Sequence, residues 1–181
     1  MYRPILIASL ALPLFACGSK STVNEKNASV EEVSQKVRQA SHDQGFIRPG
    51  KWQSTVTIEK MDMPGMPPEA REQMKKMFAN SRVSETCVTP EQAKQPNPKM
   101  FAGNDQCRYD HFTMGKGKID AEMHCTQQGA SQKMTMAGTY GPDAYSMHMT
   151  STTESGPAGG AMTMKMAVDA KRVGECTGKE S

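Results

Sequence analysis

Leucine is missing from almost the whole chain. Its only copies, at positions 6, 10, 12 and 14, lie within the first sixteen residues, whereas fifteen of the sixteen methionines lie beyond them. Most domains build their interior from leucine, isoleucine, valine and phenylalanine. The folded part of this chain must therefore build much of its interior from methionine.

Other absences exclude classes of function. The formal net charge is only +3 and no stripe of lysine and arginine is visible, which argues against a nucleic-acid partner. The sequence has no H-E-x-x-H, no G-x-S-x-G and no glycine-rich phosphate loop, and its four histidines are scattered. Asp120 with Glu122, and Asp105 with Asp110, are interpreted as solvated groups. We expect a protein that is not an enzyme and has no cofactor.

The N-terminus has the pattern of an export signal. One positive charge, at Arg3, precedes an apolar stretch at 5–16, which is too short for the roughly twenty residues that span a bilayer. We predict a signal peptide over 1–16.

The signal ends in a sequence similar to a lipobox, Leu-Phe-Ala-Cys-Gly, although Phe15 is bulkier than the usual residue. This predicts acylation of Cys17 and a partner membrane held through that anchor. Gly18, where an acidic residue would indicate the inner membrane, favours a periplasmic protein on the outer membrane. Ordinary secretory cleavage near Ala16 is the alternative.

The remaining cysteines indicate two disulfide bonds. Their number is even, they follow an export signal, and three pairings are possible among Cys87, Cys107, Cys125 and Cys176. Spacings of 20, 18 and 51 residues lack the C-x-x-C pattern of a zinc site, so zinc is the weaker interpretation. Adjacent strands favour Cys87–Cys107, which leaves Cys125–Cys176.

Apolar residues recur at every second position through most of the chain, a pattern typical of strands. The predicted strands are 51–60, 82–89, 107–114, 118–125, 133–140, 145–150 and 162–168. Glycine-rich turns separate several of them. We predict a mainly β fold: a single antiparallel meander of about seven strands with one apolar face, forming a curled sheet or partly open barrel.

Two helices and a tether complete the predicted organisation. Residues 17–28 are polar and predict a flexible tether, and 29–44 predicts a short amphipathic helix that starts with a capping box of Ser29 and Glu32. The β domain occupies 45–181. A second short helix, begun by Pro68, is expected after the first strand.

A set of short motifs resembles a known family. They are Pro49-Gly50-Lys51-Trp52, Met63-Pro-Gly-Met66, Cys87-Val88-Thr89-Pro90-Glu91, Cys107, Cys125 and Arg172-Val173-Gly174-Glu175-Cys176. Their order and spacing over roughly 45–176 resemble the domain of unknown function 3617 of proteobacterial envelope proteins. The resemblance implies a secreted or lipid-anchored envelope protein and supplies no catalytic residue.

The methionines admit several interpretations. Core packing is the first, since thioethers fill irregular gaps. Met61, Met63 and Met66 form an M-x-M-x-x-M cluster that could bind monovalent copper or silver. A methionine-lined groove for an apolar ligand and a reversible sink for oxidants are further alternatives. The leading expectation is a lipid-anchored envelope protein with a structural or binding role and an unidentified partner.

Overall fold

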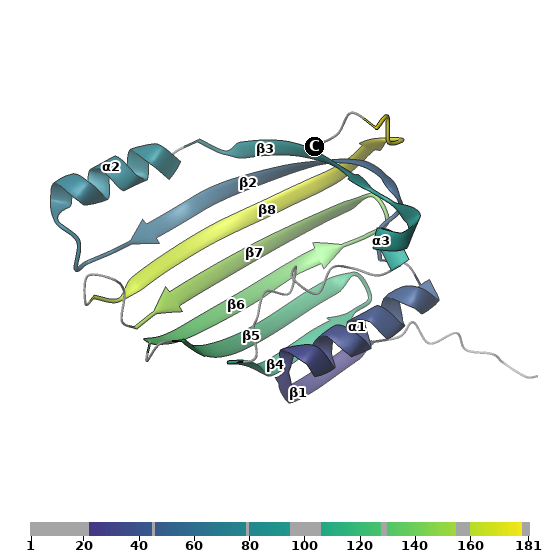
Figure 1. Cartoon of the computed structure of the whole chain (residues 1–181), viewed down its shortest axis with the longest axis horizontal. Helices are drawn as coiled ribbons and strands as arrows, with labels where there is room; N and C mark the ends of the chain where they lie inside the picture. Colours follow the sequence, from purple (N-terminus) through teal and green to yellow (C-terminus); the bar gives the residue numbers. More distant parts are fainter. Residues whose placement is uncertain are drawn as a thin grey trace, which may run out of the picture.

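The computed structural model describes residues 22–44, 46–78, 80–94, 106–127, 130–154 and 160–178, which form one eight-stranded sheet with three short helices (Figure 1). The helices are α1 (Val30–Gln44), α2 (Pro68–Phe78) and α3 (Pro90–Lys94). The strands are β1 (Val23–Ser29), β2 (Gly50–Asp62), β3 (Arg82–Val88), β4 (Cys107–Gly115), β5 (Lys118–Gln127), β6 (Ala130–Tyr140), β7 (Ala144–Thr153) and β8 (Met162–Gly174). The predicted mainly β class is confirmed.

The strand order departs from a plain meander. Across the sheet it runs β1-β4-β5-β6-β7-β8-β2-β3, with every neighbouring pair antiparallel. β4 to β8 form the predicted meander, but β2 and β3 lie beyond β8, and β1 lies beside β4. Alternating apolarity assigns each residue to a face and carries no information on which strand is the neighbour.

The expected curled sheet or partly open barrel is wrong. The sheet is open, with β1 at one edge and β3 at the other (Figure 1). Closure would need hydrogen bonds between these two edges. One end of the apolar face is buried by α1 instead, so the sheet does not have to close to bury it.

The segment expected to be a tether contains β1. Val23 and Ala28 are each 5% exposed, and β1 pairs with β4 from Val23 opposite Met114 to Ser29 opposite Arg108. The strand is short and mostly polar, and Asn27 has a φ of 49° that interrupts its alternation. The sequence pattern was therefore too weak to predict it.

The predicted amphipathic helix, α1, is an integral part of the core. Val33 and Val37 are fully buried and belong to one apolar cluster with Phe112 of β4 and Ile119 of β5. Burial in this cluster raises the pKa of Tyr109 to about 12.

The predicted capping box of α1 is confirmed. The backbone N–H of Glu32 donates to Oγ of Ser29 at 3.2 Å, and the N–H of Ser29 donates to Oε2 of Glu32 at 2.7 Å. The hydrogen bonds from Ser29 hold the pKa of Glu32 below its usual value. The two side chains thus satisfy donors that the first turn of a helix leaves free.

The sheet has the predicted polar and apolar faces. Across β5, β6, β7, β8 and β2, one row of the apolar face reads Ala121, Met136, Met149, Met166 and Ile58. The neighbouring row of the polar face reads Glu122, Thr135, Thr150, Lys165 and Lys60. The methionines of the strands lie on the apolar face, as their spacing predicted.

Both disulfides are present, but the expected pairing is wrong. Cys87 is bonded to Cys176 and Cys107 to Cys125. Cys107 and Cys125 are directly opposite in the antiparallel pair of β4 and β5. β3 and the end of β8 flank β2, and this brings Cys87 and Cys176 together. The pairing follows from the strand order, which sequence alone did not predict.

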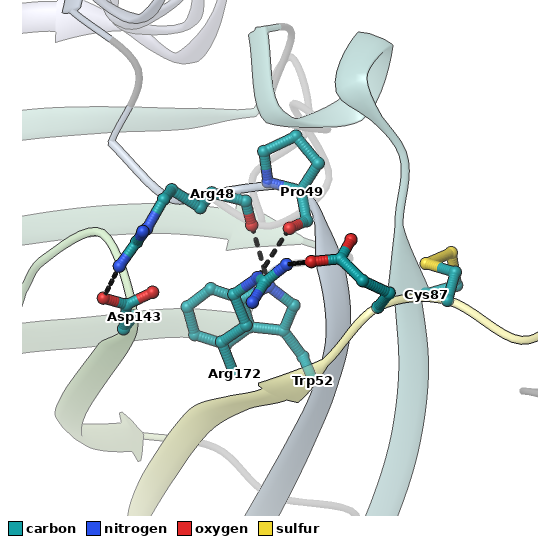
Figure 2. A network of polar contacts seen from close by, with 8 residues as sticks. Arg48, Pro49, Trp52, Cys87, Asp143 and Arg172 are labelled. Carbon is teal, nitrogen blue, oxygen red and sulfur yellow. Dashed lines mark hydrogen bonds and ion pairs between the residues drawn. A yellow bond between two sulfur atoms is a disulfide. The ribbon is translucent and has the colours of Figure 1, made fainter.

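Residues of the motifs at the two ends of the domain meet at one corner of the sheet (Figure 2). The guanidinium of Arg172 donates from Nε to the carbonyl of Pro49 at 2.7 Å and forms an ion pair with Glu175. The indole of Trp52, 2% exposed, donates to the carbonyl of Arg48 at 3.0 Å. The contact between Arg172 and Pro49 links the last strand to the start of β2, so this corner joins the two ends of the domain.

Gly50 is required at this corner. Its φ is +138°, and a Cβ there would lie 2.5 Å from both Nε of Arg172 and the carbonyl oxygen of Gly174. Any side chain would displace the arginine. The glycine of the Pro-Gly-Lys-Trp motif therefore has a packing role.

Candidate functional site

The apolar face of the sheet has a covered half and an open half. α1 contacts β1 and β4, and the buried apolar cluster lies beneath it. In Figure 1, no helix of the described chain lies across β7, β8 or β2. We call the partly exposed residues there the open methionine face: Ile58, Met61, Met149, Met162, Met164 and Met166.

The open methionine face is continuous across three strands. Met149 of β7 is opposite Met166 of β8, which is opposite Ile58 of β2. In the next row Met164 is opposite Met61. Each of these side chains is partly exposed, and unbranched thioethers adapt to varied apolar shapes. The arrangement is suited to a flexible apolar ligand.

A groove borders this face where β2 ends beside α2. It has a volume of about 430 Å³. Its walls are apolar at Ile58, Met61 and Phe78 and charged at Glu59, Lys60, Asp62, Arg71 and Lys75. Because Ile58 and Met61 belong to both surfaces, the groove is a polar margin of the open methionine face.

Arg71 is the one groove residue with an unsatisfied buried donor. Its Nη2 donates to the carbonyl of Met66 at 3.1 Å, while its Nε is buried without a hydrogen-bond partner. The helix geometry explains its position, since Arg71, Lys75 and Phe78 follow one another at intervals of one turn along α2. Nearly all buried donors in native structures have a partner, which distinguishes this one from the other donors of the groove.

The structure separates the environments of the three loop methionines. Met61 lies in β2 on the open methionine face, and Met63 is only 4% exposed. Met66 lies in the turn that follows, and its backbone N–H donates to the carbonyl of Met63 at 3.1 Å. Binding of monovalent copper or silver by these residues stays a prediction.

The polar face carries histidine–carboxylate pairs. Nδ1 of His124 lies 2.5 Å from Oδ2 of Asp110, and with a carboxylate oxygen of Glu122 these atoms lie within 4.8 Å of one another. An extra residue in β4, where the register shifts between Tyr109 and His111, accompanies this grouping.

These charges compensate one another. Nζ of Lys133 lies 2.8 Å from Glu122, and this hydrogen bond is the chief cause that lowers the pKa of Glu122. His148 points to the same polar face, 3.4 Å from Glu59 and away from its methionine neighbours, because successive side chains of a strand point to opposite faces. We interpret the whole set as solvated polar pairs.

The disulfides indicate in which compartment this β-sheet protein is found. The two disulfides indicate an extracytoplasmic protein, since such bonds persist in oxidising compartments. Among the described residues, no helix has both the length and the apolarity to cross a bilayer. The predicted signal peptide, 1–16, and the predicted acylation site, Cys17, lie outside the described residues.

The chain belongs to the family described as protein of unknown function DUF3617, whose model matches residues 47–176. The resemblance inferred from the motifs is thereby confirmed. No curated protein and no solved structure matches the chain.

Sequence reasoning identified the methionine face and missed Arg71. The spacing of Arg71, Lys75 and Phe78 could have suggested a cationic and apolar helix face. Nothing in that spacing indicates that the face borders β2, because this depends on how the chain turns between Asp62 and Pro68.

Proposed function

We propose that this protein binds chain-like apolar ligands on the open methionine face, outside the cytoplasm and held at the outer membrane by an acylated Cys17. The observation that carries the proposal is the continuous row of thioethers on the half of the apolar face that α1 leaves uncovered. A non-enzymatic binding role agrees with the absence of a catalytic motif from the sequence.

The chemistry of the face favours acyl or alkyl chains over rigid ligands. Methionine has three rotatable bonds and a polarisable sulfur, so a row of them adapts to a chain at small cost. Each methylene group removed from water contributes about 0.8 kcal/mol. A ligand with about ten such groups gains about 8 kcal/mol when all of them are buried, which is of the same order as the loss of its own freedom.

A double substitution at the centre of the open face tests ligand binding. Met149→Gln with Met166→Gln keeps the side-chain length and places amides against the chain of the ligand, where they lose hydrogen bonds to water. We expect at least about tenfold weaker binding, about 1.4 kcal/mol. The measurement is the fluorescence of N-phenyl-1-naphthylamine and its displacement by dodecan-1-ol.

Met77→Gln is the matched control, because Met77 is 67% exposed on α2 and outside the open face. It should bind the probe as the wild type does. Absence of probe binding to the wild type, or equal binding by the double variant, would rule out the proposed function. Silver titration of the Met61, Met63 and Met66 to Leu triple variant tests soft-metal binding as a separate role.

The anchor has its own test. Cys17→Ser in the full chain removes the only thiol available for acylation at the predicted lipobox, and we expect the protein to move from the membrane fraction to the soluble periplasmic fraction. Mass spectrometry of the wild type should show a diacylglyceryl group on Cys17. An unmodified N-terminus beginning after Ala16 would contradict the anchor and leave ligand binding unaffected.

A further inference from the structure

We infer that the ligand of the open methionine face is a single-chain amphiphile with a carboxylate head, a fatty acid, whose head is bound by Arg71. The inference rests on the proposed function and adds the polar half of the ligand. It starts from the buried Nε of Arg71, which has no hydrogen-bond partner. Because Nη2 of Arg71 donates to the carbonyl of Met66, a carboxylate in the groove pairs with the positive charge of the guanidinium and with its remaining N–H donors.

The other charged side chains that line the groove each have a partner of opposite charge, and among the described residues Arg71 is the groove cation without one. Lys75 forms an ion pair with Glu72 at 2.8 Å, and Lys60 lies 3.9 Å from Asp62. Glu59 pairs with His148 at 3.4 Å. Within the described part of the chain, no carboxylate lies within ion-pair distance of Arg71, whose one side-chain hydrogen bond goes to the neutral carbonyl of Met66. An anionic head supplies the missing partner.

The groove connects this cation to the apolar surface. Arg71 lines it together with Ile58 and Met61, which lie opposite Met166 and Met164 in the sheet. A head bound at Arg71 therefore places the first methylene groups beside Ile58 and Met61 and directs the chain across β8 toward Met149 of β7. One ligand then supplies a counter-charge for the guanidinium and covers the thioethers.

The orientation of the apolar residues on α2 supports the same ligand. Phe78 lines the groove and is partly buried, although no residue of α2 is fully buried. A helix with an apolar side that is incompletely covered gains contacts when an acyl chain enters between it and β2. Single-chain amphiphiles fit this narrow margin, which lies between one helix and one strand.

The experiment compares two ligands that differ only in the head. Dodecanoate, below its critical micelle concentration, and dodecan-1-ol each displace N-phenyl-1-naphthylamine from the full chain. We expect dodecanoate to bind at least about tenfold more tightly than the alcohol. Arg71→Gln should reduce that ratio to about twofold, because it weakens binding of dodecanoate more than binding of the alcohol. Lys76→Gln, on an exposed position of α2 that does not line the groove, should keep the wild-type ratio.

A second measurement is independent of any substitution. The ¹⁵Nε resonance of Arg71 should shift on addition of dodecanoate and stay unchanged with dodecan-1-ol. Equal affinity of the wild type for both ligands, or an Arg71→Gln protein that keeps the preference, would overturn the inference and leave the proposed function standing. Failure of both ligands to displace the probe would overturn the proposed function itself.

Discussion

Replacing both Cys87 and Cys176 with alanine should lower the free energy of unfolding by about 4 to 5 kcal/mol. The bond joins two residues that are 89 positions apart in the sequence. A cross-link reduces the conformational entropy of the unfolded chain, and this reduction grows with the length of the closed loop. Cys176 is exposed and Cys87 partly exposed, so the alanines leave no large cavity. Urea denaturation followed by circular dichroism measures the loss.

The single variant Cys87→Ala is the matched control, because it breaks the same bond and should lose nearly as much stability as the double variant. Peptide mapping without reductant should recover Cys87 linked to Cys176 and Cys107 linked to Cys125. Losses below about 1 kcal/mol, or a peptide that links Cys87 to Cys107, would contradict the pairing described here.

Phe112→Ala should be the other strongly destabilising change, with a loss of about 3 to 5 kcal/mol. Phe112 is fully buried beneath α1 and packs edge-on against Tyr109, with ring centroids 5.4 Å apart. Removing the ring leaves a cavity between helix and sheet that neither element can close without losing other contacts. Thermal and urea unfolding both measure this effect.

Met149→Ala gives the comparison on the other half of the same face. Met149 is partly exposed and lies outside the apolar cluster beneath α1, so we expect a loss of about 1 kcal/mol. This difference follows directly from the division into covered and open halves. Equal losses for Phe112→Ala and Met149→Ala would show that the open half is part of the core and would remove the basis of the ligand site.

Much of the local structure was predictable because it depends on short-range patterns. Period-two apolarity located the strands from β2 to β8, and Ser29 with Glu32 located the start of α1. β1 escaped prediction because it is short, mostly polar and interrupted at Asn27. Its stability comes from pairing with β4 and from burial under α1.

The chemical nature of the candidate site was predictable from the sequence, but its position on the sheet was not. Alternation assigned the methionines to one face of the sheet, as the structure confirms. Which of them stay open depends on α1, whose Val33 and Val37 cover β4 and β5 and leave Met149 and Met166 partly exposed. Arg71 became a candidate only when its Nε was found buried beside the end of β2.

The sequence by itself determined the family, the mainly β class, the presence of two disulfides and the side of the sheet on which each methionine of the strands lies. These properties depend on residue type and on spacing along one chain segment. Only the tertiary structure decided the strand order, the cysteine pairing, the openness of the sheet and the position of the groove. They depend on which segments meet in space, and β-strands with the same alternation can pair with any neighbour until packing and cross-links select one.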